Sequence, residues 1–397
     1  MYKKTLLLAL AGMLSFSYGR GNDGGGNIDR VLRSIEANNK ELRAKAQWTA
    51  AQKLEDRTEN NLADPSLSYA HLWKSKDKSE TIGELVVSQS FDFPSLYVTR
   101  RQLNRLKAGV YDNRALLFRE ELLLQAKETC LDIILLRRQK KLLDERLRNA
   151  EELSEMYARR LEAGDANILE MNKIKLELLN ARTEASMNKA ALNNLLQKLT
   201  ELNANLPVDF DDDRYPDVTF PADYQALKAE VMASDRTLAA FEKESLTAHK
   251  QVTVNRSQWL PKFELGYRRN TESGTPFNGL VVGFSFPLFE NRHKVKAAKA
   301  QALDIDLQKE NATLQAEAEL MRLYREAETL YRSMQEYQNT FESGRNLDLL
   351  KQAVTGGQIN MIEYFVEVSV IYQSRQNLLQ LENQYQKAMA RIYKGRL

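Results

Sequence analysis

Apolar residues recur along this chain with two different periods. In two short stretches, within 66–93 and 262–286, every second residue is apolar, which is typical of strands with one apolar face. The stretches that follow carry apolar residues at seven-residue steps between charged ones, as at Leu135 and Leu142. Seven-residue spacing is typical of helices that pack as coiled coils. The pattern therefore predicts long helices and two β-hairpins.

The same order of sequence markers occurs twice. The two copies are related by a shift of 193 to 196 residues. Four markers in one order with nearly constant spacing indicate an internal duplication. The paired markers are Asn39 and Leu42 with Asp235 and Leu238, Pro65 with Pro261, FDFP (91–94) with FSFP (284–287), and Gly164-x-x-Asn167-x-x-Glu170 with Gly357-x-x-Asn360-x-x-Glu363.

Each repeat predicts a first helix, a hairpin, a long helix and a returning helix. A long helix of this kind spans roughly 100 Å, more than one globular core requires. Residues 206–221 connect the repeats and are acidic, which alone is compatible with an exposed linker. The predicted elements are helix 28–60, hairpin 64–94, long helix 95–163 and helix 168–205 in the first repeat (28–205), and helix 222–257, hairpin 261–287, long helix 288–356 and helix 360–393 in the second (222–397).

The two faces of the predicted strands differ. Phe263 and Leu265 alternate with Glu264 and Gly266, so one face is apolar and the other is polar or small. This pattern favours a strand between lipid and a watery lumen, and a soluble hairpin with one buried face is the alternative. In lipid, unpaired strand edges leave backbone groups unsatisfied. Four strands are too few for a barrel, eight leave no open lumen and twelve leave a water-filled one, so several copies must share a barrel.

Aromatic residues cluster where the predicted strands meet the helices, as expected for side chains at a membrane interface. Pro94 and Pro287 lack the N–H that would extend the sheet, and proline suits the first turn of a helix. The expected interface aromatics are Tyr69, Phe91, Phe93, Phe263, Phe284, Phe286 and Phe289.

The N-terminus has the pattern of a secretory signal peptide. Lys3 and Lys4 precede an apolar run, and small residues follow it, which predicts cleavage after Gly19. Residues 20–27 are Gly-rich. No later stretch offers the ~20 consecutive apolar residues of a membrane-spanning helix. We therefore expect an exported protein.

Composition argues against several classes of function. The net charge is only +3 over 397 residues, and no basic patch suggests nucleic-acid binding. The one cysteine, Cys130, excludes an intrachain disulfide. The three histidines share no metal-ligand spacing, and no catalytic set is recognisable. The sequence thus predicts neither an enzyme nor a cofactor or metal site.

The duplicated plan, the SQWLPKFELGY and FSFP segments and the paired Gly-x-x-Asn-x-x-Glu turns resemble the TolC-type outer membrane efflux proteins over residues 28–393. The resemblance implies a mainly helical fold that forms a homotrimer. In it, a twelve-stranded β-barrel in the outer membrane of a Gram-negative bacterium continues as a periplasmic α-helical barrel, with 206–221 in an equatorial band. The implied function is the passive exit duct of a tripartite efflux pump for small molecules or ions. The implied partners are outer membrane lipid, a periplasmic adaptor protein and an inner-membrane transporter, which the LADPSLSY segment suggests is of the resistance-nodulation-division (RND) type.

In that family the helical turns form the periplasmic tip and its gate. The family's Tyr and Arg near the second turn are replaced here by Val354 and Ile359, and a second acid by Val366, so closure is expected to rest on packing. An outer-membrane component of type I protein secretion has the same fold and stays an alternative, as does an exported coiled-coil structural protein. The residues implied are Glu170, Glu363, Ile359 and Val366 at the gate, with Met361 and Ile362 packing there, and Gly164, Asn167, Gly357 and Asn360 at the adaptor-contact turns.

Overall fold

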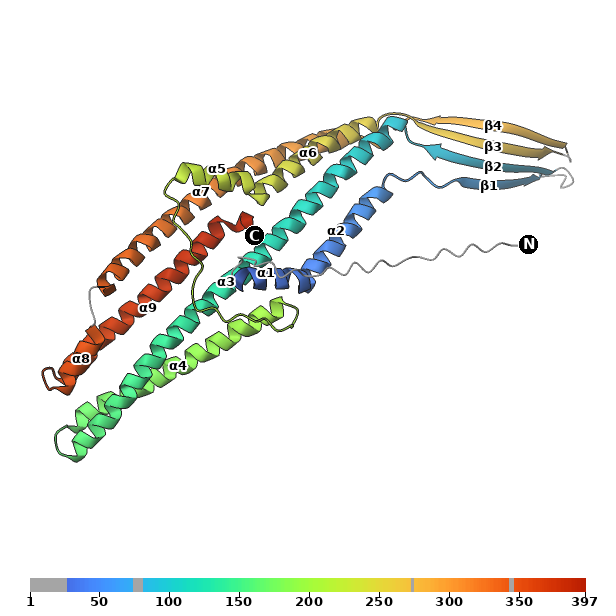
Figure 1. Ribbon diagram of the computed structural model, residues 1–397. Coiled ribbons are helices and arrows are strands. Elements are labelled where there is room, and N and C mark those ends of the chain that lie inside the picture. Colours follow the sequence, from blue (N-terminus) through green and yellow to red (C-terminus); the bar gives the residue numbers. More distant parts are fainter. Residues whose placement is uncertain (1–26, 74–80, 273–274, 343–345) are drawn as a thin grey trace, which may run out of the picture.

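The chain folds into an elongated molecule with strands at one end and helical turns at the other (Figure 1). This computed structural model describes residues 27–73, 81–272, 275–342 and 346–397. Helix α3 (Pro94–Glu162) runs from the strands to the turns, and its 69 residues span roughly 100 Å. The predicted signal peptide (1–19) and all but the last residue of the predicted Gly-rich segment (20–27) lie outside the described residues.

The four strands form one antiparallel sheet in the order β1-β2-β3-β4. Pairing of β2 with β3 joins the two repeats, with Phe91 opposite Phe263 and Ser88 opposite Gly266. In the described chain, β1 and β4 each have one neighbouring strand and form the edges of the sheet. The strands are β1 (Ser66–Trp73), β2 (Thr81–Phe91), β3 (Lys262–Glu272) and β4 (Thr275–Ser285).

The first helix of each repeat is broken, so the prediction of single helices over 28–60 and 222–257 was wrong. The breaks fall at Asn39 and Asp235, which are equivalent positions of the duplication. Asn39 Oδ1 accepts from the backbone N–H of Leu42 at 2.9 Å, and Asp235 Oδ1 from that of Leu238 at 3.0 Å. Such a side chain starts a new helix by satisfying its first N–H groups. The resulting helices are α1 (Asn27–Asn38), α2 (Lys40–Thr58), α5 (Tyr224–Ser234) and α6 (Arg236–Ser257).

The second long helix begins later than predicted. The sequence predicted a helix over 288–356, but α7 starts only at Lys294. Turns occupy the residues before it, because His293 has a left-handed backbone (φ 67°) and the buried Asn291 donates from Nδ2 to the Gln258 carbonyl at 2.5 Å. Pro94, by contrast, begins α3 directly. The remaining helices are α4 (Ile168–Leu202), α7 (Lys294–Glu342), α8 (Asn346–Thr355), α9 (Met361–Ile392) and the 3₁₀ helix η1 (Lys394–Arg396).

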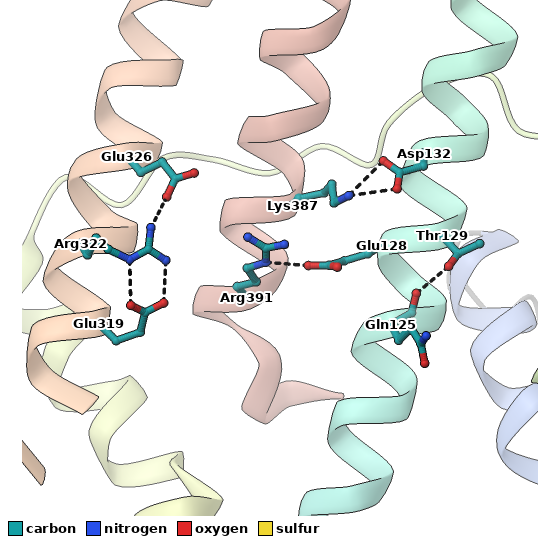
Figure 2. Close-up of polar contacts among 9 residues, drawn as sticks. All are labelled: Gln125, Glu128, Thr129, Asp132, Glu319, Arg322, Glu326, Lys387 and Arg391. Atoms are coloured by element: carbon teal, nitrogen blue, oxygen red, sulfur yellow. Dashed lines mark hydrogen bonds and ion pairs between the residues drawn. The ribbon is translucent and has the colours of Figure 1, made fainter. Parts of the chain in front are cut away.

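Ion pairs set the register of the helices where α9 passes between α3 and α7 (Figure 2). Lys387 of α9 contacts Asp132 of α3 at 2.9 Å, and Arg391 contacts Glu128 at 2.6 Å. On α7, Arg322 bonds only within its own helix among the residues drawn there. Each such surface pair contributes only about 0–1 kcal/mol, so these pairs align the helices and apolar packing stabilises them.

The connecting segment, 206–221, packs against the helices instead of hanging free. Phe210 is buried in a cluster with α1, α3 and α4, and Arg137 donates to the Asp212 carbonyl at 2.9 Å. Farther along, the Tyr385 hydroxyl of α9 donates to the Val218 carbonyl at 3.1 Å. These contacts favour a strap around the middle of the molecule over the exposed acidic linker that the sequence left open.

Gly266 lies at a close approach between strands of the two repeats. A Cβ atom there would sit 2.6 Å from the Val87 carbonyl oxygen and 2.9 Å from the Ser88 Cβ. We therefore expect Gly266→Ala to destabilise the sheet by about 1–3 kcal/mol, since overpacking forces the backbone apart. Thermal unfolding of the purified protein, followed by its β-strand circular dichroism, measures the effect.

Gly279→Ala is the matched control, because Gly279 lies on the same sheet face with nothing within 4 Å of an added Cβ. Equal unfolding temperatures for the two variants would contradict the close approach of β2 and β3.

Candidate functional site

One face of the sheet is apolar over most of its length. Directly opposed residues of an antiparallel pair share a face, so the register aligns the apolar positions of all four strands. Several are largely exposed, with Leu280 at 87%. A contiguous exposed apolar surface of this kind marks contact with lipid or another protein. The residues are Leu67, Tyr69, Leu85, Val87, Phe91, Phe263, Leu265, Tyr267, Leu280, Val282 and Phe284.

The predicted interface aromatics divide into three groups. Phe93, Phe263 and Phe284 pack together where the sheet meets the helices, with ring centroids 5.5–5.8 Å apart, and Phe91 is paired with Phe263. Tyr69 lies on the same face in β1, nearer the loop between β1 and β2. The remaining two follow β4 in the turn before α7 and are exposed: Phe286 and Phe289.

The opposite face is mainly small and polar. Its apolar exceptions are Leu72, Ile82, Val86, Phe277 and Val281. Ser66 and Ser88 share a hydrogen bond of 2.8 Å between their hydroxyl groups, and Arg268 contacts the Glu84 carboxylate at 2.8 Å. Gly266 belongs to the same face. Water is a suitable neighbour for this surface, whereas lipid is not.

At the other end of the molecule, two equivalent turns reverse the chain. Gly164 ends α3 with φ 80°, and Gly357 follows α8 with φ 71°, left-handed conformations that glycine adopts without strain. After each glycine, a backbone N–H bonds back across the last helical turn, from Asp165 to the Arg160 carbonyl and from Gln358 to the Ala353 carbonyl, both at 2.8 Å. This is the Schellman arrangement that closes helix C-termini.

The next helix of each turn begins with a reciprocal capping box. Asn360 Oδ1 accepts from the Glu363 N–H at 2.9 Å, and the Glu363 carboxylate accepts from the Asn360 N–H at 2.9 Å. Asn167 and Glu170 repeat the arrangement at 2.9 and 3.1 Å. The Gly-x-x-Asn-x-x-Glu motif is therefore a helix stop followed by a helix start. Both glutamates, predicted for the gate, have this structural role whether or not they also serve a gate.

The apolar residues predicted at the gate lie in different environments. Met361 is buried and Ile359 packs against the same cluster, which joins the two turns through residues of α3, α4, α8 and α9. Val366, in contrast, is 57% exposed, as is Val370 at 58% one turn further along α9. The side chain of Ile362 lies outside the described residues. Val366 and Val370 thus expose apolar side chains near this end of the molecule.

Polar contacts between α3 and α9 were missed by sequence reasoning. Asn149 of α3 donates to the Tyr372 hydroxyl of α9 at 2.7 Å, and Arg375 of α9 contacts Glu145 of α3 at 3.4 Å. Burial raises the pKa of the nearby Tyr364 to about 12, so this phenol stays neutral at physiological pH. Any movement of α9 away from α3 would break these contacts. Pairs so far apart in sequence leave no local signal.

The described residues contain no group of three or more His, Cys, Asp or Glu placed to hold a metal ion. Among the described helices, none combines the length and the apolar character needed to cross a membrane.

The fold belongs to a known class of membrane protein. A Pseudomonas aeruginosa membrane protein has a similar structure, with a TM-score of 0.79 at 15% identity over 94% of this chain and 90% of that one. The Campylobacter jejuni CmeC outer membrane channel matches with a TM-score of 0.77 at 14% identity (93% and 85% covered). The open state of the Neisseria gonorrhoeae MtrE outer membrane channel matches with 0.76 at 13% identity (93% and 88% covered). The chain therefore has the fold of outer membrane channels.

Sequence comparison adds the family. Residues 227–395, most of the second repeat, match the family described as outer membrane efflux protein. A search of curated protein sequences found no match. The family match covers less than half of the chain, and it agrees with the resemblance drawn from the sequence. This is a family of transport proteins of the outer membrane, not of enzymes.

Variants of the capping boxes separate the effect of the glutamate charge from the effect of helix capping. We expect Asn360→Ala to destabilise the first turn of α9 by about 1 kcal/mol, because it removes the acceptor for the Glu363 N–H. Asn360→Ser retains an acceptor, and Glu363→Gln retains the reciprocal bond, so both are expected near the wild type. Amide hydrogen exchange in residues 361–364 measures the local opening. Equal exchange in the alanine and serine variants would contradict a capping role.

Proposed function

We propose that this chain is one subunit of a homotrimeric exit duct in the outer membrane, through which small molecules or ions leave the cell passively. The observation that carries the proposal is the sheet, which has one apolar face, one polar face and two open edges. In a bilayer, an open edge leaves N–H and C=O groups unpaired at a cost of several kcal/mol each. Pairing β4 of one copy with β1 of the next removes every edge.

Three copies fit this closure. Three four-stranded sheets supply twelve strands, enough for a barrel with a water-filled lumen. The apolar face then lies against lipid, with Phe93, Phe263 and Phe284 at the boundary where strands become helices. The helices leave from one end of the sheet and would continue the wall away from the membrane (Figure 1).

The helical turns are proposed as the periplasmic tip. Glu170 and Glu363, repeated around a threefold axis, would place carboxylates around the entrance. Val366, exposed on α9, is the predicted gate residue best placed to pack against its copies. Gly164, Asn167, Gly357 and Asn360 would present the turns to a periplasmic adaptor protein. An inner-membrane transporter, for which we propose the RND type, would supply the energy.

The first test is assembly and conductance. We expect the full-length mature chain to require detergent for extraction, to run on gels as a trimer that heating converts to monomer, and to form ion-conducting pores in planar bilayers. The alternative of an exported coiled-coil structural protein predicts extraction without detergent. A water-soluble monomer, or a trimer without conductance, would overturn the proposal.

A second test concerns the charge at the tip. We expect Glu363→Gln to lower the cation preference of single channels, because the substitution removes one carboxylate per subunit while keeping the helix cap. The measurement is the reversal potential in a KCl gradient. Asn360→Ser is the control, since it alters the same capping box without changing charge. An unchanged cation preference would assign Glu363 to helix capping alone.

A further inference from the structure

The polar face of β3 carries charged residues at alternate positions. From the helical end outward, these positions are Lys262, Glu264, Gly266, Arg268, Asn270 and Glu272. Lys262 lies 3.3 Å from the Glu290 carboxylate, and Arg268 lies 2.8 Å from the Glu84 carboxylate. Glu264 has no ion-pair or hydrogen-bond partner within the ranges the structure describes. It is thus the unpaired charge that lies between the two ion pairs; Glu272, at the outer end of β3, is also unpaired among the described residues.

The surroundings of Glu264 are small and uncharged. Its direct neighbours across the sheet are Ser90 on β2 and Gly283 on β4. The carboxylate lies over Gly283, because a Cβ atom there would be 3.2 Å from Glu264 Oε2. A larger residue at position 283 would occupy this space.

Charged groups on elements next to this part of β3 form ion pairs of their own. The Arg100 guanidinium of α3 contacts the Asp92 carboxylate at 2.6 Å, next to the end of β2. The pairs Lys262–Glu290 and Arg268–Glu84 lie on either side of Glu264 along β3. Each pair is neutral as a unit, so the negative charge of Glu264 is uncompensated at its level of the sheet.

We propose that Glu264 determines the charge preference of the strand-walled part of the duct, separately from the tip. The inference rests on the proposed function, because threefold symmetry converts one unpaired carboxylate into a ring of three. Rings of acidic side chains favour cations, and a low-dielectric wall focuses their field into the lumen. Cationic or divalent solutes would therefore be favoured on leaving the duct as well as on entering it. The neighbours of each carboxylate across the sheet are serine and glycine.

The experiment compares full-length channel variants in planar bilayers under a KCl gradient. We expect Glu264→Gln to lower the K⁺/Cl⁻ permeability ratio about twofold or more, because it removes three charges from one level of the lumen. Glu264→Asp retains the charge and is expected to keep the wild-type ratio. The double variant Glu84→Gln/Arg268→Gln removes a neutral pair from the same face and is the control for mutating the lumen wall.

The outcomes separate the two proposals. If the wild-type trimer conducts and Glu264→Gln keeps its permeability ratio, the role of Glu264 is overturned while the duct stands. If the wild-type trimer does not conduct, the duct itself fails. Should Glu264→Gln not assemble, Ser90→Lys places an ammonium directly opposite an intact Glu264. A lower ratio in that variant supports the inference, and a wild-type ratio overturns it.

Discussion

The unpaired backbone of β1 and β4 is the constraint on which the rest of the molecule depends. A sheet of four strands with an exposed apolar face cannot bury that face within its own chain, because the helices leave from one end of the sheet and do not cover it (Figure 1). Hydrocarbon can cover the apolar face but cannot satisfy the edges. In the proposed trimer, neighbouring subunits would pair the edges while lipid covers the apolar face. The duplication supplies the sheet within each chain, since β2 and β3 come from different repeats.

The same duplication determines where the helices begin and end. Each repeat interrupts its first helix with a capping residue, Asn39 or Asp235, and reverses at a glycine with a left-handed backbone, Gly164 or Gly357. Each of these local capping arrangements contributes only about 1 kcal/mol, yet together they determine where the long helices bend or reverse. Asn39 also donates from Nδ2 to the Leu202 carbonyl at 2.8 Å, which ties its bend to the end of α4.

Local patterns predicted the hairpins, their two faces and both turns, because alternation and the Gly-x-x-Asn-x-x-Glu spacing are features of short segments. Features that depend on the register between distant segments were not predictable. Glu120, for example, is buried near Arg236 (3.6 Å) and Lys394 (3.9 Å), and burial raises its pKa. Pro287 resembles Pro94 in sequence, but the contact of Asn291 with Gln258 replaces a helix start by turns. Likewise, the sequence alone does not show that Glu264 is unpaired, because this depends on the strand register that brings Arg268 to Glu84.

The charge along the proposed duct depends on which carboxylates already cap a helix or form an ion pair. Glu363 and Glu170 hold helix N-termini, where a negative charge also complements the helix dipole, so their presence does not require a role in conduction. Glu264 caps no helix and pairs with no cation among the described residues, and so has no structural reason of this kind to be charged. Among the described residues on the polar face of β3, Lys262 and Arg268 lie in neutral ion pairs, whereas Glu264 and Glu272 do not. Burying or crowding an unpaired carboxylate is unfavourable unless water or a passing cation can solvate it. The position of Glu264 on an open, hydroxyl-lined face provides that solvation, and it places the uncompensated charge where a solute would pass.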